Sequence, residues 1–332
     1  MIFPTFPKPG DVLGIAAPSA GVGHKLESFD ESLARLRARG YEIVETASVR
    51  NDSDRSASAE VRGREFSELL ADDRVRAVLS ASGGDYNIEM LPYLDVDPLL
   101  RTPKWIAGAS DPTNILYYLT TTYDVATLYG FNAGSFDGEV LHPFQERALD
   151  ILSGNLVKQE SFEFCDSNRD FDLPSSYDAP VSWDLYLPNE EGRKAANQHL
   201  DVSGRLIGGC IDCISKLIGT PYDGTSLFVN RYEDIVWYFD NFAMSAFDLY
   251  LTLVQMSYAG YFRHAKAVLF GRTLFTKDSD EDYTSLIARV LKVPFLWNAD
   301  IGHVKPCFTL INGATAHVVQ ENGKGSLTME LR

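Results

Sequence analysis

The first half of the chain alternates short apolar runs with segments in which apolar residues recur every three or four positions. The apolar runs predict strands and the periodic segments predict helices. Strands are predicted at residues 12–17, 41–46, 75–80, 104–107 and 125–129, and helices at 26–39 and 61–70. Strands that alternate with helices are typical of a parallel sheet covered on both faces, so we expect an α/β fold.

The periodicity fails between Gly154 and Ser203, where Asp, Ser, Asn and Pro are frequent. Periodic signals resume at Gly204. Strands are predicted at 205–208, 235–239, 267–270, 294–297, 307–311 and 316–320, and helices at 210–218, 245–259 and 283–291. We therefore expect an N-terminal α/β domain over 1–153, a connecting region over 154–203 with one or two strands around 181–187, and a C-terminal α/β domain over 204–332.

Composition narrows the class of protein. The 332 residues are 45% apolar and 23% charged, which is typical of a folded chain, and the length favours two domains. The formal net charge of −16 argues against general affinity for nucleic acid or an anionic membrane. An anionic substrate would need a local basic pocket.

The number of cysteines and the first ten residues indicate where in the cell the protein is expected. Four cysteines are too few for a disulfide framework and fit a reducing compartment. The first ten residues have no basic leader and are broken by prolines, and no stretch approaches the roughly 18 apolar residues of a membrane span. A cytoplasmic location is expected.

The most informative local sequence is K-W-I-A-G-A-S-D-P-T-N-I-L at residues 104–116, where a predicted strand runs into a helix. Asp111 suits the N-cap and Pro112 the first helical position. Ser110 would then lie at a strand-to-helix turn, beside N–H groups that can stabilise an oxyanion. The sequence is G-x-S-D rather than the hydrolase G-x-S-x-G, and ordinary turn chemistry is the alternative interpretation.

A second turn, Ser82-Gly83-Gly84-Asp85, follows the predicted strand 75–80. In a parallel sheet it would emerge at the same edge as Ser110. Paired glycines let backbone N–H groups approach a ligand closely, although a simple tight turn accounts for them too.

Among the six histidines, His303 alone follows a strong strand pattern, and Gly302 precedes it. A histidine base needs a carboxylate on its other ring nitrogen. Asp240 ends the strand 235–239, and its position favours it over the competing carboxylates Glu233, Asp234 and Asp300. The remaining histidines are expected to be solvated, to flank helices or, for His317, to pack in a strand; these are His24, His142, His199, His264 and His317.

Metal and cofactor sites have weaker support. Cys210 and Cys213 have zinc-like spacing but no second pair at a matching interval, so buried cysteines are expected. Gly21 and Gly23 lack the third glycine of a dinucleotide fingerprint, and no phosphate-binding P-loop sequence is present. We expect neither a metal nor a cofactor. The acidic residues at 278–282 are interpreted as solvated surface.

The combination G-I-A-A-P-S-A-G, S-G-G-D, G-A-S-D-P-T, I-G-G-C-I-D-C, F-D-N and D-I-G-H resembles the LD-carboxypeptidase family of serine peptidases from about Pro7 to Val319. This family includes muramoyltetrapeptide carboxypeptidases and microcin-immunity peptidases. The resemblance implies a glutamine amidotransferase-like or flavodoxin-like N-terminal domain, a smaller C-terminal α/β domain and a site between them. It also implies a homodimer that cleaves a bond between an L-centre and a D-amino acid, such as the terminal D-alanine of a murein tetrapeptide, without a metal.

The family's motifs match Ser110 as nucleophile and His303 as base, with oxyanion contacts implied from the N–H groups of Gly84 and Asp111. The family's third member is usually Glu, and Asp240 stands there with one methylene fewer. Lys305, near the base, would either meet a substrate carboxylate or point into solvent.

Two alternatives stay open. One is an immunity-type amidase for a peptide-nucleotide antibiotic, which an aromatic clamp would favour; Trp105 and Trp183 are available but are expected in the core. The other is a catalytically drifted protein that binds peptidoglycan fragments.

Overall fold

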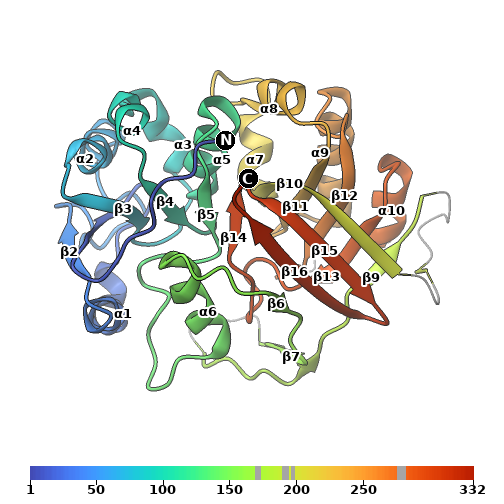
Figure 1. Cartoon of the computed structure of the whole chain (residues 1–332), viewed down its shortest axis with the longest axis horizontal. Helices are drawn as coiled ribbons and strands as arrows, with labels where there is room; N and C mark the ends of the chain where they lie inside the picture. The colour runs from blue at the N-terminus through green and yellow to red at the C-terminus, as the bar shows by residue number, and fades with distance from the viewer. Residues whose placement is uncertain (169–172, 189–193, 196–198, 275–281) are drawn as a thin grey trace. The chain divides into compact units, whose positions relative to one another are not determined.

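The computed structural model describes residues 1–168, 173–188, 194–195, 199–274 and 282–332. The chain forms two compact units (Figure 1). The first comprises Met1–Val157 with Thr309–Asn312, and the second comprises Lys158–Phe308 with Gly313–Arg332. Within the described ranges no helix has the length and apolar character needed to cross a membrane.

The first unit is built on a six-stranded sheet in the order β14-β5-β4-β3-β1-β2. Its parallel strands are β1 (Val12–Ala16), β2 (Glu42–Glu45), β3 (Val75–Ser80), β4 (Trp105–Gly108) and β5 (Thr127–Tyr129). Its helices are α1 (Leu26–Ala38), α2 (Ala59–Ala71), α3 (Asn87–Met90), α4 (Asp97–Arg101), α5 (Thr113–Tyr123) and α6 (Pro143–Leu152). The central strands are buried almost throughout, which explains their continuous apolar runs.

The sixth strand of this sheet comes from near the other end of the chain. The predicted strand at 307–311 is observed as β14 (Leu310–Asn312), which pairs antiparallel with β5 of the first unit. This strand was expected in the C-terminal domain, but it joins the sheet of the first unit instead. A three-residue apolar run predicts a buried strand but carries no information about its partner.

The second unit contains an eight-stranded mixed sheet in the order β6-β16-β15-β10-β11-β12-β13-β9. Four neighbouring strands are parallel: β10 (His199–Cys210), β11 (Ile235–Asp240), β12 (Ala265–Gly271) and β13 (Phe295–Ala299). Antiparallel strands extend both sides: β6 (Gln159–Glu160), β9 (Asp184–Tyr186), β15 (Thr315–Glu321) and β16 (Lys324–Glu330). The α/β fold is thus confirmed in both units.

The helices of the second unit are α7 (Ile211–Leu217), α8 (Thr225–Arg231), α9 (Ala246–Tyr258) and α10 (Tyr283–Val290). The predicted N-terminus at Ser245 is observed, since its side chain accepts the Asp248 N–H at the start of α9. The sequence patterns predict neither β16 nor α8.

The region 154–203 is more structured than its composition indicates. From Lys158 onward it belongs to the second unit and supplies β6, β9 and the small pair β7 (Phe164–Cys165) and β8 (Ala179–Pro180). The predicted strand at 205–208 begins at His199, because β15 continues the pairing as far as Glu321. Strands of two or three residues are too short to produce a periodic signal.

The parallel strands set the positions of the candidate residues. In the first unit, β3 and β4 lead at their carboxyl ends into the turn at 82–85 and into Ser110. In the second unit, β11 ends at Asp240, and β13 leads into the loop that carries His303. Carboxyl ends of neighbouring parallel strands share one edge of a sheet, which is where α/β proteins bind ligands.

Candidate active site

Ser110 occupies a strained turn between β4 and α5. Its φ is +67°, in the left-handed region that residues other than glycine seldom adopt. The turn is closed by the Thr113 N–H, which donates to the Ser110 carbonyl at 2.9 Å. Such a turn after a strand is the geometry that presents a nucleophilic serine in α/β-hydrolases.

Asp111 does not cap α5, so this prediction was wrong. Helix α5 starts at Thr113 after Pro112, without a side-chain cap. The Asp111 carboxylate instead accepts the Ser19 hydroxyl at 2.5 Å, the Asn87 main-chain N–H at 2.7 Å and the Asn114 amide at 2.8 Å. The Ser19 and Asn87 donors come from other segments, so the carboxylate ties the loop after β1 and the start of α3 to the nucleophile turn.

The Gly83-Gly84 turn lies against Ser110. A Cβ on Gly83 would be 3.1 Å from the Ser110 Cβ and 3.3 Å from its Oγ. Gly84 has φ +138°, and a Cβ there would lie 2.4 Å from the Ser19 Oγ. Among the described residues the Gly84 amide has no hydrogen-bond acceptor. The two turns predicted to share a sheet edge are therefore adjacent. Close approach to Ser110 restricts position 83, and both the positive φ and the lack of space favour glycine at position 84.

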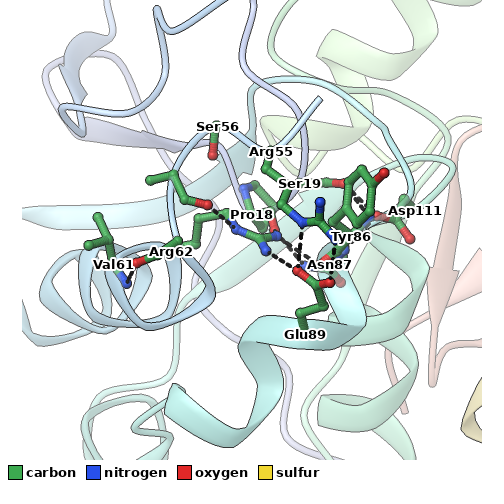
Figure 2. A network of polar contacts seen from close by, with 12 residues as sticks. Pro18, Ser19, Arg55, Ser56, Val61, Arg62, Tyr86, Asn87, Glu89 and Asp111 are labelled. Atoms are coloured by element: carbon green, nitrogen blue, oxygen red, sulfur yellow. Dashed lines mark hydrogen bonds and ion pairs between the residues drawn. The ribbon is translucent and has the colours of Figure 1, made fainter. Parts of the chain in front are cut away.

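A buried arginine holds these loops in place (Figure 2). The Arg62 guanidinium donates to the carbonyls of Pro18 and Tyr86, each at 2.7 Å, and to Glu89 at 2.9 Å. In Figure 2 it lies between the loop that carries Ser19 and the segment that carries Tyr86. Sequence reasoning missed Arg62 because an arginine on a helix ordinarily faces solvent.

In the second unit, Asp240 and His303 form a pair. The Asp240 side chain is 1% exposed and its Oδ2 lies 2.7 Å from the His303 Nδ1, although the N–H at Nδ1 is not aimed along that line. The His303 main-chain N–H donates to the other Asp240 oxygen at 3.3 Å. Hydrogen bonds of this kind commonly tighten when a substrate binds. Ser110 belongs to the first unit, so its joining to this pair is part of the proposal below.

Gly302 makes the pair possible. Its φ is +94°, and a Cβ there would lie 2.0 Å from the Asp240 Oδ1. Any side chain at this position would occupy the space that the carboxylate fills. The glycine is visible in the sequence, but its contact with the aspartate is visible only in the structure.

The charge of Asp240 tunes the imidazole. Burial is the largest single influence and lowers the pKa of His303, but the Asp240 carboxylate and the charge of Asp212 together raise this pKa above its ordinary value. Asp212 accepts the main-chain N–H groups of Phe242 and Ala243 at 3.0 and 3.1 Å. The Phe242 ring centre lies 4.5 Å from that of His303. Asp212 thus shapes the turn after β11, a role that sequence reasoning missed.

The loop that carries His303 is clamped by a buried ion pair. Arg272, which follows β12, donates to the Asp300 Oδ1 at 2.6 Å, to the Val304 carbonyl at 2.9 Å and to the Pro306 carbonyl. The Trp183 indole donates to the other Asp300 oxygen at 2.8 Å. Burial raises the pKa of Asp300, and the arginine opposes this shift. Asp300 therefore fixes the loop and does not compete for His303.

The other candidates lie elsewhere. Asp234 pairs with Lys266 at 2.9 Å before β11, at the opposite end from Asp240. The His142 Nδ1 accepts the Phe144 N–H at the start of α6. His317 lies on the solvent face of β15 and pairs with Asp201 at 2.8 Å, so the predicted packing role was wrong. His24 and His199 are exposed, as expected.

The cysteines and glycines of the rejected metal and cofactor motifs have structural roles. Cys210 and Cys213 are buried, and the hydrogen bond between them, with burial, raises the pKa of Cys210. In the ranges that the structure describes, no group of three His, Cys, Asp or Glu side chains is placed to hold a metal. A Cβ on Gly21 would lie 2.1 Å from the Asn51 carbonyl, so this glycine permits two loops to touch. The acidic cluster lies outside the described residues except for Asp282.

Comparisons with known proteins concern the fold and the family. The Microcin C7 self-immunity protein MccF of Escherichia coli is 24% identical over 96% of this chain and 93% of its own length. A structure of MccF in complex with aspartyl sulfamoyl adenosine superimposes with a TM-score of 0.80 at 21% identity, over 100% of this chain and 99% of that one. A muramoyltetrapeptide carboxypeptidase from Oxalobacter formigenes gives a TM-score of 0.74 at 20% identity, over 96% and 99%. These structures share the fold.

Two family patterns match the sequence itself. The LD-carboxypeptidase N-terminal domain matches residues 13–130, and the LD-carboxypeptidase C-terminal domain matches residues 203–318. Together they span well over half of the chain and include Ser110, Asp240 and His303. The chain therefore belongs to the LD-carboxypeptidase family of peptidases.

Proposed function

We propose that this protein is a serine carboxypeptidase that hydrolyses an LD-peptide bond, such as the one that releases terminal D-alanine from a murein tetrapeptide in cell-wall recycling. One observation carries the proposal: the Nδ1 of His303 lies 2.7 Å from a fully buried Asp240 carboxylate. This pairing favours the tautomer in which Nε2 is the basic nitrogen, which a serine mechanism requires.

In the proposed reaction the Ser110 Oγ attacks the scissile carbonyl while its proton moves to the Nε2 of His303. The N–H groups of Gly84 and Asp111 stabilise the resulting oxyanion. His303 then returns the proton to the leaving amine, the C–N bond breaks and the D-amino acid departs. A water molecule, deprotonated by His303, hydrolyses the acyl-enzyme and restores the Ser110 hydroxyl.

The aspartate at position 240 fits this role despite its shorter side chain. Because Gly302 leaves the space beside it open, the Asp240 carboxylate reaches both Nδ1 and the main-chain N–H of His303. If the site is adapted to aspartate, Asp240→Glu lowers turnover. A large gain in turnover would instead support the alternative of a drifted protein that binds peptidoglycan fragments.

A nucleotide-directed immunity amidase has less support. Trp105 and Trp183 are fully buried, as the sequence predicted, so neither presents a ring to a base. Trp105 stacks on Phe6 and Trp183 donates to Asp300.

The direct test is Ser110→Ala incubated with a defined murein tetrapeptide, with released D-alanine detected by mass spectrometry. Loss of the nucleophile is expected to reduce turnover by about 10³-fold or more, by analogy with other triads. Ser28→Ala, which removes a hydroxyl bonded only to the Lys25 carbonyl, is the matched control. Release of D-alanine by Ser110→Ala at the wild-type rate would refute the proposal.

The resemblance also supports a homodimer, and the cysteine usage supports a cytoplasmic location. Cys165, Cys210, Cys213 and Cys307 are all buried and none of them forms a disulfide, which suits a reducing compartment.

A further inference from the structure

We propose that Lys305 determines exopeptidase specificity: its ammonium binds the terminal carboxylate of the substrate, so that the enzyme removes one residue from a free C-terminus. This inference rests on the proposed carboxypeptidase function and names the chemical group that the enzyme recognises. It concerns a residue whose role the sequence left open between substrate binding and simple exposure.

Lys305 and His303 line the same small cavity in the second unit. Val304 lies between them in its wall, and Asp166 and Leu274 contribute to the rest. The cavity holds about 30 Å³, which is room for roughly two water molecules. That volume suits the polar head of a small ligand rather than a nucleotide base.

The backbone that carries Lys305 is fixed on both sides. Arg272 holds the carbonyls of Val304 and Pro306, and the Asp166 N–H donates to the Lys305 carbonyl at 2.8 Å. The Lys305 side chain is exposed, and within the described residues its ammonium forms no ion pair or hydrogen bond. A cation on a rigid support and without an internal partner is preorganised for an anionic ligand.

The charged side chains of Arg272 and Asp166 already have partners, so Lys305 is the group available to bind the terminal carboxylate. Arg272 is buried and forms an ion pair with Asp300. The Asp166 carboxylate, which could repel a substrate anion, is occupied by its own segment: one oxygen accepts the N–H groups of Asn168 and Ser176 and the Ser176 hydroxyl. In a chain with a net charge of −16, an anionic substrate needs such a local cation.

The position of the scissile bond in an exopeptidase substrate limits the distance between the imidazole and the group that binds the terminal carboxylate. The terminal carboxylate lies one residue beyond the scissile bond, and consecutive Cα atoms are about 3.8 Å apart. His303 protonates the leaving amine in the proposed mechanism, so the carboxylate must be bound within about one residue length of the imidazole. Lys305 is two positions along the same clamped loop and is the lysine that lines the same cavity.

The experiment compares a murein tetrapeptide with a free C-terminus and the same peptide as its C-terminal amide. The wild type is expected to prefer the acid. Lys305→Met is expected to lower kcat/KM for the acid by roughly 10- to 100-fold, mainly through KM, which is the loss of one charge-assisted hydrogen bond. Lys305→Arg should retain the preference. Lys292→Met, at another exposed lysine of the same unit, should leave both substrates unaffected.

Binding separates this inference from the proposed hydrolysis. Calorimetric titration of Ser110→Ala and of Ser110→Ala with Lys305→Met, using both peptides, measures recognition without turnover. Weaker binding of the acid alone upon loss of the lysine supports the inference, even if the wild type hydrolyses neither peptide. An acid-to-amide binding ratio that Lys305→Met leaves unchanged would overturn it, as would an equal loss for both peptides.

Discussion

At the scale of single residues, the contact between Asp240 and His303 controls the direction in which the pKa of His303 shifts. The carboxylate is fully buried, so its charge acts on the imidazole with little screening by water. Burial alone would lower the pKa of His303, and the carboxylate reverses this shift. The direction of the pKa shift therefore reports whether the pair is intact.

This pair predicts the pH dependence of activity. A general base acts in its neutral form, so the raised pKa of His303 places the acid limb of the wild-type kcat/KM profile above pH 6.5. In Asp240→Asn the charge is lost while burial remains, so the limb should move to lower pH. Plateau activity should fall by about 10²- to 10⁴-fold.

The measurements are a pH-rate profile and an NMR titration of the His303 ring in both proteins. An acid limb that stays in place after Asp240→Asn would contradict the assignment.

Gly302 allows a second prediction at this scale. Gly302→Ala would place a Cβ 2.0 Å from the Asp240 Oδ1, so we expect kcat to fall by about 10²-fold as the pair is displaced. Gly219 has a similar φ of +81° and no atom within 4 Å of its Cβ position. Gly219→Ala therefore reproduces the backbone strain without the collision.

Steady-state kinetics and thermal unfolding of the two variants separate the effects. Both should lose about 1 kcal/mol or more of unfolding free energy from the positive φ. Only Gly302→Ala should lose turnover, and equal turnover in the two variants would disprove the steric argument.

At the scale of elements, the loops after β11, β12 and β13 act together. Asp212 shapes the turn after β11, and Arg272 after β12 fixes the loop after β13. In the first unit, Arg62 and Asp111 link the loops after β1 and β3 to the turn after β4 in the same manner. Ser110 and His303 thus stand on loops whose conformation depends on buried charged side chains.

The Arg272 clamp can be tested by comparison with a surface pair. Arg272→Met leaves Asp300 buried without its cation and should cost about 3–5 kcal/mol of unfolding free energy. Lys266→Met breaks the exposed Lys266–Asp234 pair and should cost at most about 1 kcal/mol. Urea unfolding followed by circular dichroism gives both values, and similar costs would show that the clamp contributes little.

At the scale of the whole molecule, helix α9 presents an apolar surface on the side away from its buried residues. Five apolar or aromatic residues recur at helical spacing along it: Phe247, Tyr250, Leu251, Val254 and Tyr258. Phe247 is 57%, Leu251 48% and Tyr258 88% exposed. A stripe along one helix can pack against its own copy about a two-fold axis, which suits the proposed homodimer.

Replacing Leu251 and Tyr258 by Asp should convert the dimer into a monomer. Light scattering after size-exclusion chromatography should then give the 36.9 kDa mass of one chain instead of twice that mass. Val140→Asp, at an apolar side chain that is 84% exposed in the first unit, is the control and should remain dimeric. A dimer that persists in the double variant would exclude α9 as its interface.

Local sequence patterns predict the strongest elements and the candidate catalytic residues. Strong apolar runs and helix-period segments fixed β1, β3, β11 and α9 to within one or two residues, because burial imposes these patterns locally. The same patterns placed Asp240 and His303 beyond the carboxyl ends of strands, and the motifs around them led to the family.

Which distant groups meet depends on the fold. The fold pairs β14 with the first sheet, brings Ser19 and Asn87 to the Asp111 carboxylate, and places Arg272 and Asp212 as supports. Each of these features is a contact between residues far apart in the chain. Its free energy depends on which group ends up buried beside which partner, and no local periodicity records that choice.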